Sequence, residues 1–436
     1  MVTEALNNAP ELSECQLIHV GPATSLPEGA DNHFDQMIQT DWSGTEFLKG
    51  TAVDAREKLA LIPFSSGTTG PPKGVMLTHS NLATNLLQFT HPKITSFKSY
   101  NEIGQQDIII GILPFGHSFA FNCVVLATLY LGAHCVTLPK FQPNNFVNIL
   151  RKYPFTFATL VTPLLNFIIQ SPEVTAAELG SLRTILTGAA PVGSAIIAAL
   201  KAKTGPNCDY IEGYGMTELS PVSHLTPPGG GKLGSMGKLV PSTRAKIINP
   251  ETMETLGANE VGELCIDGPQ VMKGYFENEK ATRETFDSEG YLRTGDLGFV
   301  DDEGYFYIVD RLKELIKVKG HQVAPSELEN LIREIPGVAD VAVIGVPHDA
   351  YGEVPRAYIV RGGDQPEVRS EHIANHLSVR LARHKQLLGG VEFVDVIPKA
   401  PSGKILRREL KKTYMEHEAA KKEMNNGVEN TNKALT

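Results

Sequence analysis

The sequence predicts an α/β fold in which a large N-terminal domain of parallel sheets flanked by helices, with a small β-barrel-like unit, precedes a small C-terminal α+β domain. Strand-like and helix-like segments alternate up to about residue 240, which is typical of a largely parallel sheet covered on both faces. Short strands with glycine turns follow, and a compact mixed pattern begins after residue 310. We therefore expect a large domain over residues 1–310, a small domain over 311–412 and a disordered tail over 413–436.

Short apolar runs predict the strands of the alternating region, and one longer run predicts a helix. The strands are expected at 60–64, 108–113, 159–161 and 184–186, and the helix at 194–203. The longest apolar stretch, residues 119–139, is interrupted by Asn122, Gly132 and His134. It is therefore predicted to be a buried helix running into a strand rather than a transmembrane segment.

The second half of the chain predicts two further units. Strands at 245–248, 262–266 and 304–308, separated by glycine turns, favour a small antiparallel unit or barrel. In the last unit, Ser326 and Glu329 have the spacing of a capping box at the start of a helix. Strands at 341–346, 357–360 and 391–397 and a second helix over 373–381 complete the α+β pattern.

Composition limits the possible partners and location. The net charge of −9 and the pI of about 5.8 argue against general binding to nucleic acid or to an anionic membrane. Five cysteines without a C-x-x-C pair indicate neither a zinc site nor a disulfide framework. Residues 1–10 lack the pattern of a secretory signal, and the last residues are not a peroxisomal tripeptide. An intracellular, most simply cytoplasmic, location is expected, and Lys201, Lys203, Lys411 and Lys412 are expected to be solvated charges.

A loop rich in glycines and hydroxyls, with one lysine, begins at Ser65 and predicts a phosphate site. Glycines let backbone N–H groups approach an anion, hydroxyls donate to its oxygens, and the lysine supplies positive charge. The spacing does not fit G-x-x-x-x-G-K-[ST], so a Walker-type nucleotidase is disfavoured. An ordinary glycine-rich turn is the alternative. The candidate ligands are Ser65, Ser66, Gly67, Thr68, Thr69, Gly70 and Lys73.

Two later segments indicate which phosphate compound is bound. Residues 213–218 place an aromatic ring, a hydroxyl and a carboxylate together: Tyr214 for stacking on a base, Thr217 for a phosphate oxygen and Glu218 for Mg²⁺. Residues 291–296 end in Asp296, whose carboxylate is suited to accept both ribose hydroxyls. Together the three segments predict a nucleoside triphosphate site, although each alone could be a turn.

These segments, with residues 310–314 and 401–404, occur in the order seen in acyl-adenylate-forming enzymes. The chain resembles acyl-CoA synthetases of the 4-coumarate:CoA ligase and firefly luciferase type from about residue 61 to 412. The resemblance implies an acid–thiol ligase that joins a small carboxylic acid to AMP from ATP·Mg²⁺ and then transfers the acyl group to coenzyme A.

The resemblance also assigns residues to nucleotide and metal. Tyr214 falls on the adenine face, the backbone of Gly188, Ala189 and Ala190 on the purine edge, and Asp296 on the ribose. Thr217 falls on the phosphate and Glu218 on magnesium.

The remaining roles implied by the resemblance concern catalysis and domain rotation. Arg311 falls on the ribose–phosphate contact, Lys404 on the lysine that bridges acyl and phosphate oxygens, and His117 beside the reacting carboxyl group. Residues 310–313 are the expected hinge. Lys317 and Gly320 fall where thioester formation and the pantetheine path are expected after rotation.

The segment before Ser65 departs from the family pattern because it is short. Only 64 residues precede Ser65, so we expect the N-terminal region of the large domain to be truncated and apolar surface to be open there. A catalytically impaired nucleotide-binding isoform therefore stays open as an alternative to the ligase. A luciferase-like adenylating enzyme, which uses the same chemistry, is the other alternative.

Overall fold

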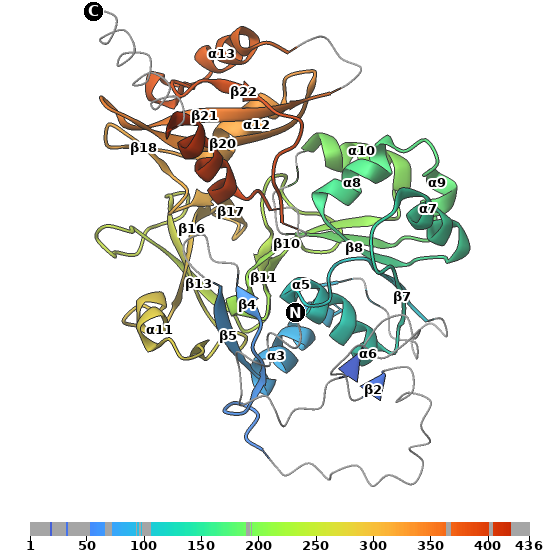
Figure 1. The fold of residues 1–436 in the computed structure, drawn as a ribbon. Coiled ribbons are helices and arrows are strands. Elements are labelled where there is room, and N and C mark those ends of the chain that lie inside the picture. Colours follow the sequence, from blue (N-terminus) through green and yellow to red (C-terminus); the bar gives the residue numbers. More distant parts are fainter. Residues whose placement is uncertain are drawn as a thin grey trace, which may run out of the picture. The chain divides into compact units, whose positions relative to one another are not determined.

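The structure is a computed structural model of the chain, and it describes residues 18–19, 32–33, 53–65, 72–92, 94–95, 97, 106–188, 192, 194–362, 368–400 and 404–419. The chain divides into two compact units, 1–53 and 54–436. In the first unit, β1 (Ile18–His19) pairs in parallel with β2 (Asn32–His33). The second unit contains all the other described elements (Figure 1).

A seven-stranded sheet forms the centre of the large domain. Its strand order is β12-β11-β10-β9-β8-β6-β7. The strands β7, β6, β8, β9 and β10 run parallel, β11 runs antiparallel to β10, and β12 runs antiparallel to β11. The predicted alternation of strands and helices is therefore confirmed. The strands are β6 (Ile108–Gly111), β7 (His134–Thr137), β8 (Phe157–Leu160), β9 (Thr184–Thr187), β10 (Asp209–Gly215), β11 (Val222–Leu225) and β12 (Lys238–Leu239).

Successive side chains of these strands enter two separate cores, as the period of a strand requires. Ile109 and Leu186 belong to one cluster, and Ile110 and Ile185 belong to the other. Both faces of the sheet are thus buried by helices, which explains the continuous apolar runs. The helices are α3 (His79–Thr90), α5 (Ser118–Ala120), α6 (Ala127–Leu131), α7 (Pro143–Lys152), α8 (Thr162–Gln170), α9 (Ala176–Leu179) and α10 (Ser194–Thr204).

The apolar stretch 119–139 runs from a continuous helical segment into a strand, as predicted. It continues from α5 through the π-helix η2 (Phe121–Leu126) and α6 into β7. Cys123, Val124 and Ala127 are fully buried in the core. In the part of the chain that the structure describes, no helix is both long and apolar enough to cross a membrane.

Two antiparallel sheets build the predicted barrel-like unit. One has the order β13-β14-β16-β17, and the other contains β15, β5, β3 and β4. Both contribute to one core, in which Val75 and Leu77 of β5 join Leu264 and Ile266 of β14. The elements are β3 (Leu59–Leu61), β4 (Phe64–Ser65), β5 (Lys73–Thr78), β13 (Arg244–Ile248), β14 (Gly262–Asp267), β15 (Gly274–Tyr275), α11 (Glu279–Thr285), β16 (Leu292–Val300) and β17 (Phe306–Arg311).

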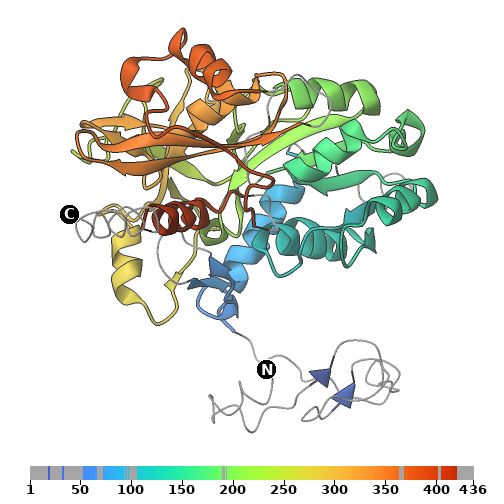
Figure 2. The ribbon, with the colours of Figure 1, turned by 45° about the horizontal axis from the view of Figure 1, so that its top comes forward.

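The C-terminal sheet also has a core on each face. Val341 and Val343 of β20 enter one cluster, and Ala342 and Ile344 enter the other. The helices α12 and α13 cover the first face, and residues 407–419 form a helix whose Leu410 packs on the second (Figures 1 and 2). The elements are β18 (Ile316–Val318), β19 (His321–Val323), α12 (Pro325–Arg333), β20 (Val338–His348), β21 (Gly352–Arg361), α13 (Ser370–Ser378), η4 (Arg383–Lys385) and β22 (Val391–Phe393).

Two sequence predictions for this region are wrong. Ser326 and Glu329 do not form a capping box, because Pro325 already lies inside the helix and Ala324 is the N-cap. The Ser326 hydroxyl donates to the Val309 carbonyl at 2.5 Å instead. In addition, residues 413–419 of the predicted tail are helical, because the helix that contains them packs Leu410 and Tyr414 on the sheet. Residues 420–436 lie outside the described part.

Lys203 also differs from its prediction as a solvated charge. Its ammonium donates to the carbonyls of Ile168, Ser171 and Val174 at 2.7–2.8 Å. These carbonyls lie at and after the C-terminal end of α8, where backbone acceptors lack helical partners and positive charge is favourable. Lys203 therefore fixes α10 against the end of α8.

Lys203→Met should lower the free energy of unfolding of the large domain by about 1.5–3 kcal/mol, because charge-assisted hydrogen bonds are lost from buried carbonyls. Urea unfolding followed by circular dichroism measures this. Lys201→Met, at an exposed site on the same helix, is the matched control and should have little effect. Equal changes in the two variants would contradict the capping role.

Candidate active site

A cavity of about 410 Å³ lies within the second unit, at the ends of β9 and β10 and beside the barrel-like sheets. Such crevices at the carboxyl ends of parallel strands are common ligand sites. Its walls contain nine of the residues predicted from the sequence. They are Ser65, Lys73, His117, Gly188, Tyr214, Thr217, Glu218, Arg311 and Lys404.

The predicted phosphate loop connects two paired strands beside the cavity. Ser65 at the end of β4 lies opposite Lys73 at the start of β5. The Lys73 ammonium lies 4.0 Å from the centre of the Tyr275 ring. Five of the predicted ligands, Ser66, Gly67, Thr68, Thr69 and Gly70, lie outside the described residues, as do Ala189 and Ala190.

Glu218 is the carboxylate predicted to bind magnesium. It is buried, and the Tyr275 hydroxyl donates to its Oε1 at 2.8 Å. No group of three or more metal-binding side chains occurs in the described ranges. A lone carboxylate still fits Mg²⁺, which is commonly held by one or two carboxylates together with the phosphates of a nucleotide.

Asp296 joins two other predicted residues. It is only 3% exposed, and it receives a hydrogen bond of 2.6 Å from the Tyr214 hydroxyl and pairs with Arg311 Nε at 3.0 Å. Burial and the Asp296 carboxylate raise the pKa of Tyr214 well above its usual value, so the phenol stays protonated as a donor. Burial raises the pKa of Asp296, and Arg311 opposes this rise. A carboxylate has about four acceptor sites, so two remain for hydroxyls of a ligand.

His117 and Thr217 both line the cavity near the start of α5, where Ser118 approaches Thr217. His117 Nδ1 accepts the Phe119 N–H at 3.3 Å, and Ser118 Oγ lies 3.4 Å from Thr217 Oγ1. Desolvation by the surrounding protein lowers the pKa of His117, although the side chain remains accessible from the cavity. A neutral imidazole is therefore presented there at neutral pH.

Lys404 enters the cavity from the small domain. Burial lowers the pKa of its ammonium, and the nearby Arg311 lowers it further. Lys317 and Gly320, predicted for a later step, are both exposed and absent from the described walls of the cavity. Gly320 has a φ of +82°, a conformation that favours glycine. The structure thus brings Lys404, but neither Lys317 nor Gly320, to the predicted nucleotide residues.

Arg407 ties the segment of Lys404 to the small domain. Its guanidinium donates to Glu329 Oε1 at 2.6 Å and to the Val343 carbonyl at 3.2 Å, and it lies 3.5 Å from Glu314. Glu329 also accepts the Val343 N–H at 2.8 Å. All of these side chains are mostly buried, so the loop that carries Lys404 has a rigid base.

Comparison with known proteins decides the family. The profile of AMP-binding enzymes matches residues 2–276, and the profile of the C-terminal domain of AMP-binding enzymes matches residues 327–404. The chain belongs to the AMP-binding enzyme family. A probable 4-coumarate–CoA ligase 3 of Dictyostelium discoideum is 44% identical over 91% of this chain and 70% of its own length.

Solved structures agree with this membership of the AMP-binding family. An anthranilate CoA ligase in complex with anthranoyl-AMP superposes with a TM-score of 0.81, at 26% identity, over 96% of this chain and 77% of that one. The o-succinylbenzoate coenzyme A synthetase of Bacillus subtilis, in complex with ATP and magnesium ion, gives a TM-score of 0.72, at 26% identity, over 94% and 82%. Both complexes belong to CoA ligases with an adenylate or its precursor bound.

The AMP-binding enzyme has site residues that sequence reasoning missed. The Glu263 carboxylate accepts a hydrogen bond of 2.6 Å from the Arg293 guanidinium and one of 3.1 Å from the Gly295 N–H. These two bonds fix the turn before Asp296. Asn85 binds both the N–H and the carbonyl of Val222 in the cavity wall. Single buried polar residues on distant segments carry no motif, so no pattern in the sequence indicates them.

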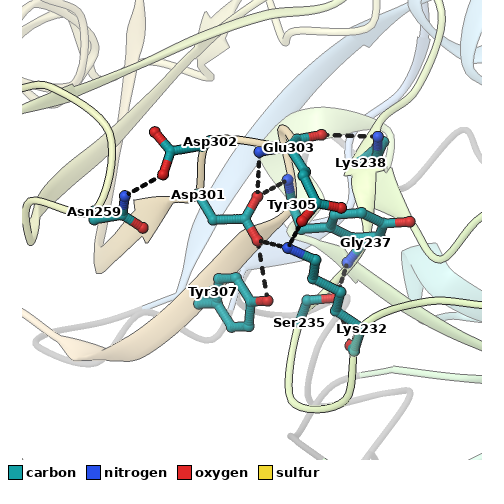
Figure 3. A network of polar contacts seen from close by, with 10 residues as sticks. All are labelled: Lys232, Ser235, Gly237, Lys238, Asn259, Asp301, Asp302, Glu303, Tyr305 and Tyr307. Atoms are coloured by element: carbon teal, nitrogen blue, oxygen red, sulfur yellow. Dashed lines mark hydrogen bonds and ion pairs between the residues drawn. The ribbon is translucent and has the colours of Figure 1, made fainter.

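A second glycine-rich segment with a lysine does not contribute to the cavity. Lys232, after three glycines, donates to Asp301 at 2.6 Å and pairs with Glu303 at 2.7 Å (Figure 3). Asp301 also accepts the N–H groups of Glu303 and Tyr305 in the turn between β16 and β17 (Figure 3). Lys232 lowers the pKa of Asp301 to about 2, so the pair stays charged. This segment anchors a loop and leaves no free cation for phosphate.

Arg407→Met should destabilise the small domain by about 3–5 kcal/mol, the cost of leaving a buried carboxylate unpaired. Thermal unfolding of the variant measures this, and Arg408→Met at the neighbouring exposed position is the matched control. Nucleotide affinity measured below the lowered melting temperature should change less than the adenylation rate. A stable Arg407→Met protein with normal adenylation would contradict the anchoring role.

Proposed function

We propose that this cavity is where the chain, an AMP-forming acid–CoA ligase, joins a carboxylic acid to AMP and then passes it to coenzyme A. One observation carries the proposal: Lys404 of the small domain lies in one cavity with Tyr214 and Glu218 of the large domain and with Arg311 at the domain junction. These are the cation, carboxylate and donor groups that transfer at phosphorus requires.

In the first step, a carboxylate oxygen of the acid attacks the α-phosphorus of ATP, and the bond from that phosphorus to the pyrophosphate oxygen breaks. Asp296 holds the ribose hydroxyls, while Arg311 and Lys404 neutralise charge on phosphate and acyl oxygens. Magnesium held by Glu218 would further neutralise the phosphate oxygens when bound. Lys73 and Thr217 align the phosphates, and His117 lies beside the acyl carboxyl group. Charge neutralisation and alignment supply the rate in such a displacement.

In the second step, the coenzyme A sulfur attacks the acyl carbonyl carbon, the carbon–oxygen bond to AMP breaks, and the thiol proton is released. Lys317 and Gly320 are exposed in the present arrangement, so we propose that rotation about residues 310–313 replaces Lys404 with this segment. Two hydrogen bonds from Ser326 hold the present arrangement of this junction. The Ser326 N–H donates to the Asp310 carboxylate at 2.9 Å, and the Ser326 hydroxyl donates to the Val309 carbonyl.

A cytoplasmic location belongs to the proposal as well. Cys123, Cys135, Cys208 and Cys265 are all free thiols in the described part of the chain. Free buried thiols are compatible with a reducing compartment, where disulfides are rare. We propose no nucleic-acid partner, because the net charge is negative.

Lys404→Ala should lower the rate of adenylation by about 10²–10³-fold, the scale for losing one transition-state donor. ATP–pyrophosphate exchange across a panel of carboxylic acids measures this step. Thioester formation from supplied acyl-adenylate should be retained, because Lys404 is not used there. A catalytically impaired isoform would show no exchange with any acid, and equal loss of both steps in the variant would contradict domain rotation.

The adenylation rate should also fall with rising pH, earlier than an unperturbed lysine with a pKa of about 10.4 would cause. Only protonated Lys404 can donate to the oxygens, and its pKa is lowered by burial and by Arg311. The proton is therefore lost at lower pH. The residual activity of Lys404→Ala should lack this alkaline decline, whereas the same decline in both proteins would assign it to another group.

Asp296→Ala should weaken ATP binding by about 1.5–3 kcal/mol, because the ribose hydroxyls lose a charged acceptor. Titration calorimetry with ATP and with its 2′,3′-dideoxy analogue separates this effect from general damage. The parent should discriminate between the two nucleotides, and the variant should do so much less. Equal discrimination would show that Asp296 does not bind the ribose.

A further inference from the structure

The cavity has two chemically different ends. Its charged side chains, among them Lys73, Glu218, Arg311 and Lys404, belong to the barrel-like sheets, to η3 (Thr217–Leu219) and to the domain junction. The other end is formed by side chains without hydrogen-bonding groups. They are Phe119, Leu186, Pro221, Val222 and Leu225, which we call the apolar arm.

The apolar arm is continuous with the hydrophobic core. Leu186, Val222 and Leu225 are 0–4% exposed and belong to the core cluster between the sheet and α3, and Phe119 packs against the same cluster. Asn85 holds the backbone of Val222 at both its N–H and its carbonyl. These side chains are therefore fixed, and the arm cannot easily rearrange to present a polar group.

Two glycines keep the arm open and narrow. A Cβ atom at Gly188 would lie 3.5 Å from Phe119 Cζ and 3.1 Å from the Gly213 oxygen. A Cβ at Gly213 would lie 3.0 Å from Leu225 Cδ2. A Cβ atom at Gly188 would thus already touch the Phe119 ring, and one at Gly213 would crowd Leu225, so side chains at these two positions would fill part of the arm.

Ser118 and His117 border the arm but do not offer a partner deep within it. The Ser118 hydroxyl lies beside Thr217, and His117 Nδ1 is used by the Phe119 N–H. Gly213 pairs with Leu225 in the ladder between β10 and β11. A hydroxyl group at the far end of an acyl substituent would thus lose its water without gaining a side-chain partner among the described residues.

We propose that the apolar arm selects carboxylic acids whose acyl group is wholly apolar, and discriminates against those with a ring hydroxyl. This inference rests on the proposed function, because the arm takes the acyl group only if the charged end takes ATP. The proposed preference for an apolar acid would distinguish this chain from the relatives named for 4-coumarate, because 4-coumarate has a hydroxylated ring. Val222 and Phe119 are the specificity-determining residues.

The expected preference is moderate. A hydrophobic pocket rejects an added hydroxyl by about 10²-fold at most, because it has no unpaired polar group of its own. We expect 3-phenylpropenoic acid to exceed its 4-hydroxy and 3,4-dihydroxy derivatives by about 10- to 100-fold in kcat/KM. The measurement is ATP–pyrophosphate exchange with the full chain at saturating ATP and magnesium.

A variant of nearly identical shape tests the cause of the preference. Val222→Thr introduces one hydroxyl into the arm and should reduce the preference several-fold, with the kcat/KM for the hydroxylated acids rising relative to the parent acid. Val240→Thr is the matched control, because Val240 is 2% exposed in the same core cluster and is not among the described cavity walls. It should leave the ratio unchanged.

The outcomes separate this inference from the proposed function. Exchange with hydroxylated acids at equal or higher kcat/KM than the apolar acid overturns the inference and leaves the ligase assignment intact. The absence of exchange with every acid counts against the function of this chain. In that case titration calorimetry of the two acids in the presence of AMP decides: tighter binding of the apolar acid supports the inference, and equal or weaker binding overturns it.

Discussion

The buried carboxylate of Asp296 connects the parts of this enzyme on which the site depends. Tyr214 reaches it from the end of the central sheet and Arg311 from the domain junction, while Asp296 itself lies on the barrel-like unit. A carboxylate that is 3% exposed persists only with partners that satisfy its charge. The three segments are therefore held in one geometry before any nucleotide binds, which lowers the entropy cost of binding.

A second set of buried charges gives the small domain its own rigidity. Arg407 satisfies Glu329, the carbonyl of Val343 and Glu314, and these contacts lie only three residues along the chain from Lys404. The position of the lysine is thus set by the interior of the domain that carries it. In the rotation proposed above, Lys404 would leave the cavity as part of a rigid body, with the change confined to residues 310–313.

Much of this molecule could be predicted from its sequence, because the information was local. Short apolar runs and glycine turns indicated the strands, and short motifs indicated Tyr214, Glu218, Asp296 and Lys404, which line or adjoin one cavity. Polar contacts between distant segments could not be predicted. Lys203 has the composition of a surface lysine, yet it caps α8. Ser326 and Glu329 have capping-box spacing, but tertiary partners at Val309 and Val343 replace the local ones.

The turn before Asp296 has a further mechanical consequence. Gly295 has a φ of +71°, its N–H donates to Glu263, and its carbonyl accepts the N–H of Leu312 at 2.8 Å. The peptide next to Asp296, the proposed ribose ligand, is therefore bonded directly to the proposed hinge. One hydrogen bond thus connects the turn beside the proposed nucleotide site to Leu312. Any coupling of nucleotide occupancy to small-domain orientation through this bond is reciprocal, so domain orientation changes the affinity for AMP by the same factor by which AMP changes the orientation equilibrium.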